Sequence, residues 1–163
     1  MTDYNIYGLF SIAEMYFNIA RNLEQKKRSH TRYNEEIEYY YLLSANLDYS
    51  PAIVNIAIYY EEICNDYNKA ITYYLQAIEH EELYAMYNLA DLYYKIKDFS
   101  KMEHYYSLAI NRYNDIDSIY KLISYYSTQL NFDKIKYYYL MAIEHSHFKR
   151  SKVLINIFFI YYK

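Results

Sequence analysis

The chain has 163 residues, of which 54% are hydrophobic and 23% are charged, so it can bury a core and extensive disorder is not expected. One Gly and one Pro are too few for the tight turns of an all-β fold, and the net charge of −3 argues against a dedicated binder of nucleic acid or another polyanion. The single cysteine, Cys64, excludes an internal disulfide framework and fits a reducing compartment.

Segments that would direct the chain to a membrane or out of the cell are not expected. Residues Met1–Phe10 lack the basic region of a secretory signal, and the longest apolar run, Val153–Tyr162, is shorter than a bilayer span. We therefore expect a soluble, intracellular protein without a membrane partner. Its 28 tyrosines occur beside many Ile, Asn and Lys residues, which favours a bias toward A- and T-rich codons as their main origin.

The predicted elements are all helices. Asp66, Asp98 and Asn131 are placed in turns, where a short polar side chain can accept a hydrogen bond from a free backbone N–H group. Ser50 before Pro51 predicts an N-cap followed by proline at the first helical position. In chain order the predicted helices cover residues of about 4–25, 33–47, 51–63, 67–80, 83–96, 99–112, 116–129, 132–146 and 149–162, in one domain spanning 1–163.

Three segments repeat along the chain. Residues 52–60 match 85–93 at an offset of 33, and a further 33 residues lead to 118–126. In the helices that follow, the matching tyrosine pairs are offset by 32 and then 33 residues, which predicts that one turn differs in length by a residue. Small residues at Ala70, Ala77 and Ala90 predict close approaches between helices.

A less regular unit precedes these three. Ile12–Tyr16 and Tyr40–Leu42, with Ser44, match the repeat pattern, but about eleven additional residues lie within 18–35. This insertion is basic and allows a second hypothesis, in which the protein is a nucleic-acid-associated factor that neutralises phosphates there. The residues of this possible nucleic-acid patch are Arg21, Lys26, Lys27, Arg28 and Arg32.

The repeats resemble tetratricopeptide repeats, and more narrowly Sel1-like repeats. The resemblance rests on A-x-x-N-[LI]-A-x-x-Y at 52–60 and 85–93, followed by D-[YF]-x-K-[AM]-x-x-Y-Y-x-x-A-I at 66–78 and 98–110. It implies an all-α, right-handed superhelical solenoid of four helix pairs (about 4–47, 51–80, 83–112 and 116–146) plus a terminal helix, 149–162. The glycine that follows the Leu in the family is Ala here. The composition is similar to that of repeat proteins from giant DNA viruses of amoebae, which would place the protein in the cytoplasm of an infected cell.

The resemblance also implies a concave groove lined by the first helix of each pair. The groove would be aromatic and mostly acidic, and would suit a partner peptide or helix with apolar anchors and some Lys or Arg. The alternative is that the tyrosines only fill the inner surface of a tight superhelix. The implied groove residues are Tyr7, Phe10, Glu14, Phe17, Val54, Ile58, Glu61, Glu62, Tyr84, Tyr87, Asp91, Tyr94, Lys95, Tyr120 and Ser124.

The last predicted helix is apolar on more than one side, and an exposed apolar patch most often marks an interface. We therefore expect a homodimer through Phe158, Phe159 and Tyr162.

No catalytic motif is present, and with Gly8 as the only glycine a phosphate-cradling loop is excluded. His145 and His147 point apart on a helix, so neither a metal nor another cofactor is expected. The sequence thus predicts a scaffold or adaptor and not an enzyme. The alternatives are the nucleic-acid factor and a self-assembling structural protein.

Overall fold

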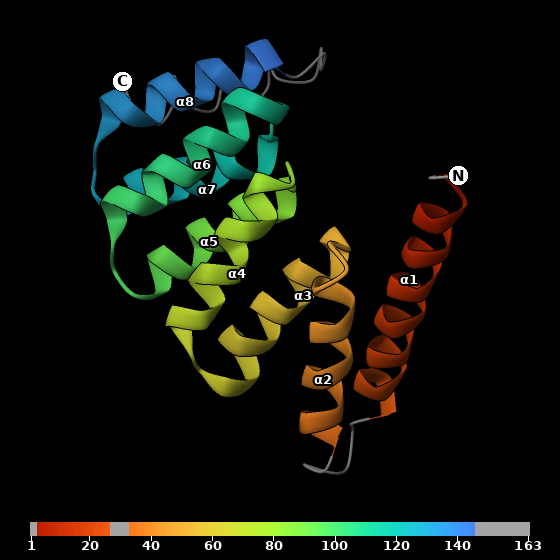
Figure 1. Ribbon diagram of the computed structural model, residues 1–163. Coiled ribbons are helices and arrows are strands. Elements are labelled where there is room, and N and C mark those ends of the chain that lie inside the picture. The colour runs from red at the N-terminus through yellow and green to blue at the C-terminus, as the bar shows by residue number, and fades with distance from the viewer. Residues whose placement is uncertain (1–2, 27–32, 146–163) are drawn as a thin grey trace. The chain divides into compact units, whose positions relative to one another are not determined.

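The computed structural model describes residues 3–26 and 33–145, and every regular element in these ranges is helical (Figure 1). The all-α prediction is confirmed for this part of the chain. Eight of the predicted helices are present, and their ends agree with the expected ones to within a few residues. The ninth, 149–162, lies outside the described residues. By its contacts the chain divides after Leu92 into two compact units.

The first unit contains α1 to α4 and most of α5. In sequence order, α1 packs on α2, α2 on α3, and α3 on α4. Their buried side chains include Ile37, Ile53 and Ile56. The helices are α1 (Asp3–Lys26), α2 (Tyr33–Ala45), α3 (Ser50–Tyr59), a π-helical turn (Tyr60–Cys64), α4 (Tyr67–Glu79) and α5 (Leu83–Lys95).

The second unit begins within α5 and is built in the same way. α6 (Phe99–Tyr113) packs on α7 (Ile116–Thr128), and α7 packs on α8 (Phe132–His145). Met102, Ile119 and Leu122 are fully buried in it.

Close helix packing depends on small side chains at repeated positions. Ala70, Ala77 and Ala90 are completely buried, as predicted. Ser44 takes the place of an alanine in the first repeat, and its hydroxyl donates a 2.6 Å hydrogen bond to the backbone carbonyl of Ala13. A side chain larger than these would separate the helix axes.

Four of the helix ends are closed by the same turn without any glycine. In each, a residue two or three positions beyond the end of the helix adopts a left-handed conformation, and the next N–H bonds to a carbonyl five residues back, as in a Schellman motif. Asn131 N–H, for example, donates to the Tyr126 carbonyl at 3.1 Å. The left-handed residues of these turns are Asp48 (φ 56°), Glu81 (φ 61°), Lys97 (φ 65°) and Leu130 (φ 52°).

Three helices, α4, α6 and α8, begin with the predicted side-chain caps. Asp66 accepts a hydrogen bond from Lys69 N–H at 3.1 Å, and Asp98 accepts one from Lys101 N–H at 3.2 Å. Asn131 does the same for Lys134. The prediction for Ser50 is wrong, because α3 already includes Ser50 and its hydroxyl instead donates to the carboxylate of Glu82.

The one-residue difference between repeats lies in a helix and not in a turn, contrary to the sequence prediction. Lys69 follows Tyr60 by nine positions, whereas Lys101 follows Tyr93 by eight. The additional residue is taken up where α3 widens into the π-helical turn, after which Asp66 N–H bonds to the Tyr60 carbonyl at 2.8 Å. π-helical structure occurs mostly as such single turns within α-helices.

Candidate functional site

A pocket of about 370 Å³ lies between α3 and α5 in the first unit. Its α3 wall comes from one helix face, because positions 51, 54, 55 and 58 recur with the spacing of successive turns. Its other wall comes from the start of α5 and the residue before it. The lining residues are Pro51, Val54, Asn55, Ile58, Glu82, Tyr84 and Asn88.

The wall of this pocket is mostly apolar, and its polar groups are few. Asn55 donates from Nδ2 to the Pro51 carbonyl at 2.7 Å, which orients the amide along α3. Glu82 is held by the Ser50 hydroxyl, a contact that connects the first turns of α3 and α5. Neither Lys nor Arg is among the lining residues, so the only formal charge at the pocket is negative.

Beyond the pocket, the next turn of both helices is acidic. Asp91 follows Asn88 by three residues, so it lies on the side of α5 that carries a lining residue, and Glu62 lies four residues after Ile58, within the π-helical turn that follows α3. Glu62 is exposed. The pKa of Tyr74 is raised by burial and by the charges of Glu61, Glu62 and Asp91.

Glu61 does not belong to an open groove, contrary to the sequence prediction. It is 8% exposed, and its Oε2 accepts a hydrogen bond of 3.0 Å from the phenol of Tyr74. The π-helical turn places Glu61 against α4, where Tyr74 is almost fully buried. The side chain is therefore a buried hydrogen-bond acceptor of the first unit.

The predicted groove residues of α1 form a separate aromatic cluster. Phe10 and Phe17 both contact Tyr49, each with ring centroids 5.3 Å apart, and Phe17 also contacts Tyr41 at 5.9 Å. Phe10 remains 57% exposed and Glu14 is exposed as well. The cluster attaches α1 to the turn before α3. Tyr7 lies in α1, but its side chain is outside the described part.

The remaining groove predictions divide between the two units. Tyr87 is half-buried in the part of α5 that belongs to the first unit. In the second unit, Tyr94 is 49% exposed and contacts Phe99 with ring centroids 6.0 Å apart. Lys95, Tyr120 and Ser124 are exposed. A continuous groove through all of these residues stays a prediction.

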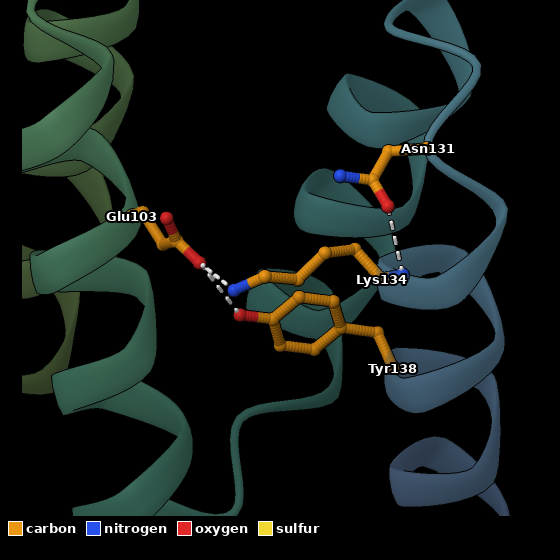
Figure 2. Close-up of polar contacts among 4 residues, drawn as sticks. All are labelled: Glu103, Asn131, Lys134 and Tyr138. Atoms are coloured by element: carbon orange, nitrogen blue, oxygen red, sulfur yellow. Dashed lines mark hydrogen bonds and ion pairs between the residues drawn. The ribbon is translucent and has the colours of Figure 1, made fainter.

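Sequence reasoning missed a repeated stack of a lysine and two tyrosines. The rings of Tyr126 and Tyr138 are stacked, with centroids 5.9 Å apart, and Lys134 Nζ lies 5.4 Å from the centroid of Tyr126. Figure 2 shows Glu103 of α6 reaching both Lys134 and Tyr138 of α8. The stacked rings of Tyr126 and Tyr138 join α7 to α8, the two helices of one pair. Equivalent stacks are formed by Tyr60, Tyr73 and Lys69, and by Tyr93, Tyr105 and Lys101.

The pocket residues that the sequence prediction missed are Pro51, Asn55, Glu82 and Asn88. Asn55 and Asn88 occupy the same place in the repeat, 33 residues apart, and that equivalence was visible in the A-x-x-N pattern. What the sequence lacked was the relative rotation of the two helices, which decides that both amides line one pocket.

The alternative sites are only partly described. Arg21 is exposed on α1, 4.0 Å from Glu24 and 5.9 Å from the ring centroid of Phe17, and Lys26 is exposed at the end of the helix. Other predicted residues lie outside the described ranges, or, for His145, have a side chain that does. These are Lys27, Arg28, Arg32, His145, His147, Phe158, Phe159 and Tyr162.

Within residues 3–26 and 33–145, no three His, Cys, Asp or Glu side chains gather as a metal-binding group. No helix in the same ranges is both long enough and apolar enough to cross a bilayer.

No protein-family model matches the chain, and no curated protein sequence matches it significantly.

Proposed function

We propose that the protein is a protein–protein interaction scaffold that binds a peptide or helix of a partner in the pocket between α3 and α5. The observation that carries this proposal is the combination of an apolar pocket of about 370 Å³ with acidic residues on the next turn of both helices. The proposed function includes neither an enzymatic activity nor a bound cofactor.

The pocket has the dimensions and the chemistry of a site for an anchoring side chain. Its volume is at the lower end of the range for ligand pockets, about 300–1,000 Å³. That size accepts one or two apolar side chains rather than a large cofactor. Tyr84, which is 70% exposed at the rim, offers a rigid aromatic surface that loses little conformational entropy on binding.

The charges around the pocket select the rest of the partner. Glu82 lines it, and Glu62 and Asp91 follow one turn further along the two helices. A partner segment with Lys or Arg about one helical turn from its apolar anchor would match both features. The amides of Asn55 and Asn88 can hydrogen-bond to the backbone or side chains of that segment.

Selection of peptides from a random library tests this proposal and needs no candidate partner. The wild type is compared with a pocket variant, Ile58→Ala with Tyr84→Ala, which removes apolar contact without adding charge. Tyr39→Ala is the matched control, since Tyr39 is 59% exposed on α2 and does not line the pocket.

We expect enrichment of peptides that combine an apolar cluster with nearby Lys or Arg. These peptides should bind the control as they bind the wild type, and bind the pocket variant at least about tenfold more weakly. Failure to enrich any peptide, or equal binding to the pocket variant, would contradict the proposal.

A further inference from the structure

Two segments of this chain carry charges of opposite sign. Residues 33–92, which include the pocket, contain eleven Asp or Glu and a single Lys or Arg, Lys69. Residues 149–163 contain four Lys or Arg and no Asp or Glu. The segregation is hidden in the small net charge of the whole chain, −3.

Segment 149–163 has the composition that the pocket favours. It begins with the basic residues Lys149, Arg150 and Lys152, followed directly by the apolar residues Val153, Leu154 and Ile155. The pocket offers Val54, Ile58 and Tyr84 for apolar contact, and Glu62 and Asp91 one turn away for the cations.

We infer that the pocket between α3 and α5 binds segment 149–163 of a second copy of this chain. The inference rests on the proposed function and names one partner for the same site. An apolar side chain from 153–155 would occupy the pocket, and the basic residues would lie beside Glu62 and Asp91. Because pocket and segment are different surfaces, the contact is heterologous, so each copy has one of each to offer.

Two variants, each changed in only one of the two contacting surfaces, allow the contact to be tested by mixing them. The pocket variant, Ile58→Ala with Tyr84→Ala, keeps its segment intact. The segment variant, Lys149→Glu, Arg150→Glu and Lys152→Glu, keeps its pocket intact. Circular dichroism checks that both remain helical, and analytical ultracentrifugation of the full chain measures their association.

We expect the wild type to associate with increasing concentration, and each variant alone to associate at least about tenfold more weakly. A mixture of the two should recover association, because it contains intact pockets and intact segments on different molecules. Adding Glu62→Lys and Asp91→Lys to the segment variant should restore self-association, since both charges are then reversed.

A labelled synthetic peptide of residues 149–163 provides a second readout by fluorescence anisotropy. It should bind the full-length chain, and binding should weaken as salt concentration rises. The same peptide with Glu at 149, 150 and 152 is the matched control and should bind at least about tenfold more weakly.

Several results would overturn the inference. A wild type that stays monomeric, or a pocket variant that associates like the wild type, contradicts docking in the pocket. Loss of association only after Phe158→Asp with Phe159→Asp, with no recovery on mixing, would instead support a symmetric contact between two such segments. If library peptides bind the pocket and peptide 149–163 does not, this inference fails while the proposed function stands. If neither class binds, both fail.

Discussion

The ammonium group of Lys134 lies 2.8 Å from Oε1 of Glu103, which joins α8 to α6 (Figure 2). The same carboxylate oxygen is 3.3 Å from the phenol of Tyr138. In the first unit, Tyr60 of the corresponding stack donates to Glu38 of α2 at 2.6 Å. Position 71, equivalent to Glu38 and Glu103, is Ile, so that repeat lacks the acid. Two of the three stacks thus carry a carboxylate from the preceding second helix.

The Glu103 contact should make the free energy of unfolding depend on pH in the acidic range. Partial burial raises the pKa of Glu103, but hydrogen bonds from Lys134, Tyr126 and Tyr138 and the charge of Lys134 outweigh it, so the net pKa is lowered. The resulting stabilisation is fully present above the unfolded-state pKa and is lost as the pH falls from about 5 through the lower folded-state pKa. Urea unfolding of Glu103→Gln across this range should show less pH dependence than the wild type, with a cost near pH 7 of about 1 kcal/mol or less. An unchanged pH profile would show that the contact contributes nothing in solution.

Removing the phenol of Tyr74 should take one hydrogen bond from a buried carboxylate. Tyr74→Phe leaves Glu61 inside the first unit, at an expected cost of about 1–3 kcal/mol in the free energy of unfolding. Tyr84→Phe is the control, because Tyr84 is 70% exposed, and it should change stability little. Urea titration followed by circular dichroism measures both. Equal effects of the two substitutions would refute the role given to the Tyr74–Glu61 hydrogen bond.

Replacing a left-handed leucine by glycine should stabilise the protein. Leu130 has φ 52° and is 71% exposed, so Leu130→Gly relieves backbone strain and removes little buried surface. The expected gain in the free energy of unfolding is about 1 kcal/mol. Leu130→Ala keeps the Cβ and should show no such gain, and Asn114→Gly should gain less because Asn tolerates φ 54°. A thermal shift that is the same for glycine and alanine at position 130 would contradict this explanation.

Deleting Cys64 should convert the π-helical turn into ordinary α-helix. The deletion shortens the distance in sequence from Tyr60 to the stacked lysine of the second repeat from nine positions to eight. In the third and fourth repeats, the equivalent lysine follows the tyrosine by eight positions. We expect the variant to fold, with a free energy of unfolding lower by less than about 3 kcal/mol. Deleting Lys97 shortens a repeat that contains no additional residue. This deletion should lower the free energy of unfolding more than the deletion of Cys64 does. Thermal unfolding compares the two, and equal losses would count against an insertion at the π-helical turn.

Much of the local structure could be predicted because it depends on nearby residues. The caps at Asp66, Asp98 and Asn131 follow from short polar side chains three residues before a free N–H, and helix lengths follow from the repeat. Ser50 shows the limit, since its hydroxyl bonds to Glu82, 32 residues away, in place of its own helix.

The candidate site was predicted less completely because it depends on helix rotation. Val54, Ile58 and Tyr84 were assigned to a groove and do line the pocket. Glu61 was assigned there too, but a one-residue insertion turned it toward Tyr74. A prediction from periodicity assumes a constant number of residues per turn. The π-helical turn breaks this assumption, so the residues after it lie on a different face of the helix than the pattern predicts.

Methyl NMR of the full-length protein tests the peptide-binding pocket most directly. With Ile and Val methyl groups labelled, a selected peptide should shift the signals of Val54 and Ile58, which line the pocket. The signals of Ile119 and Ile135 in the second unit should stay unchanged. A peptide that binds tightly without shifting the Val54 and Ile58 methyls would contradict a binding site between α3 and α5.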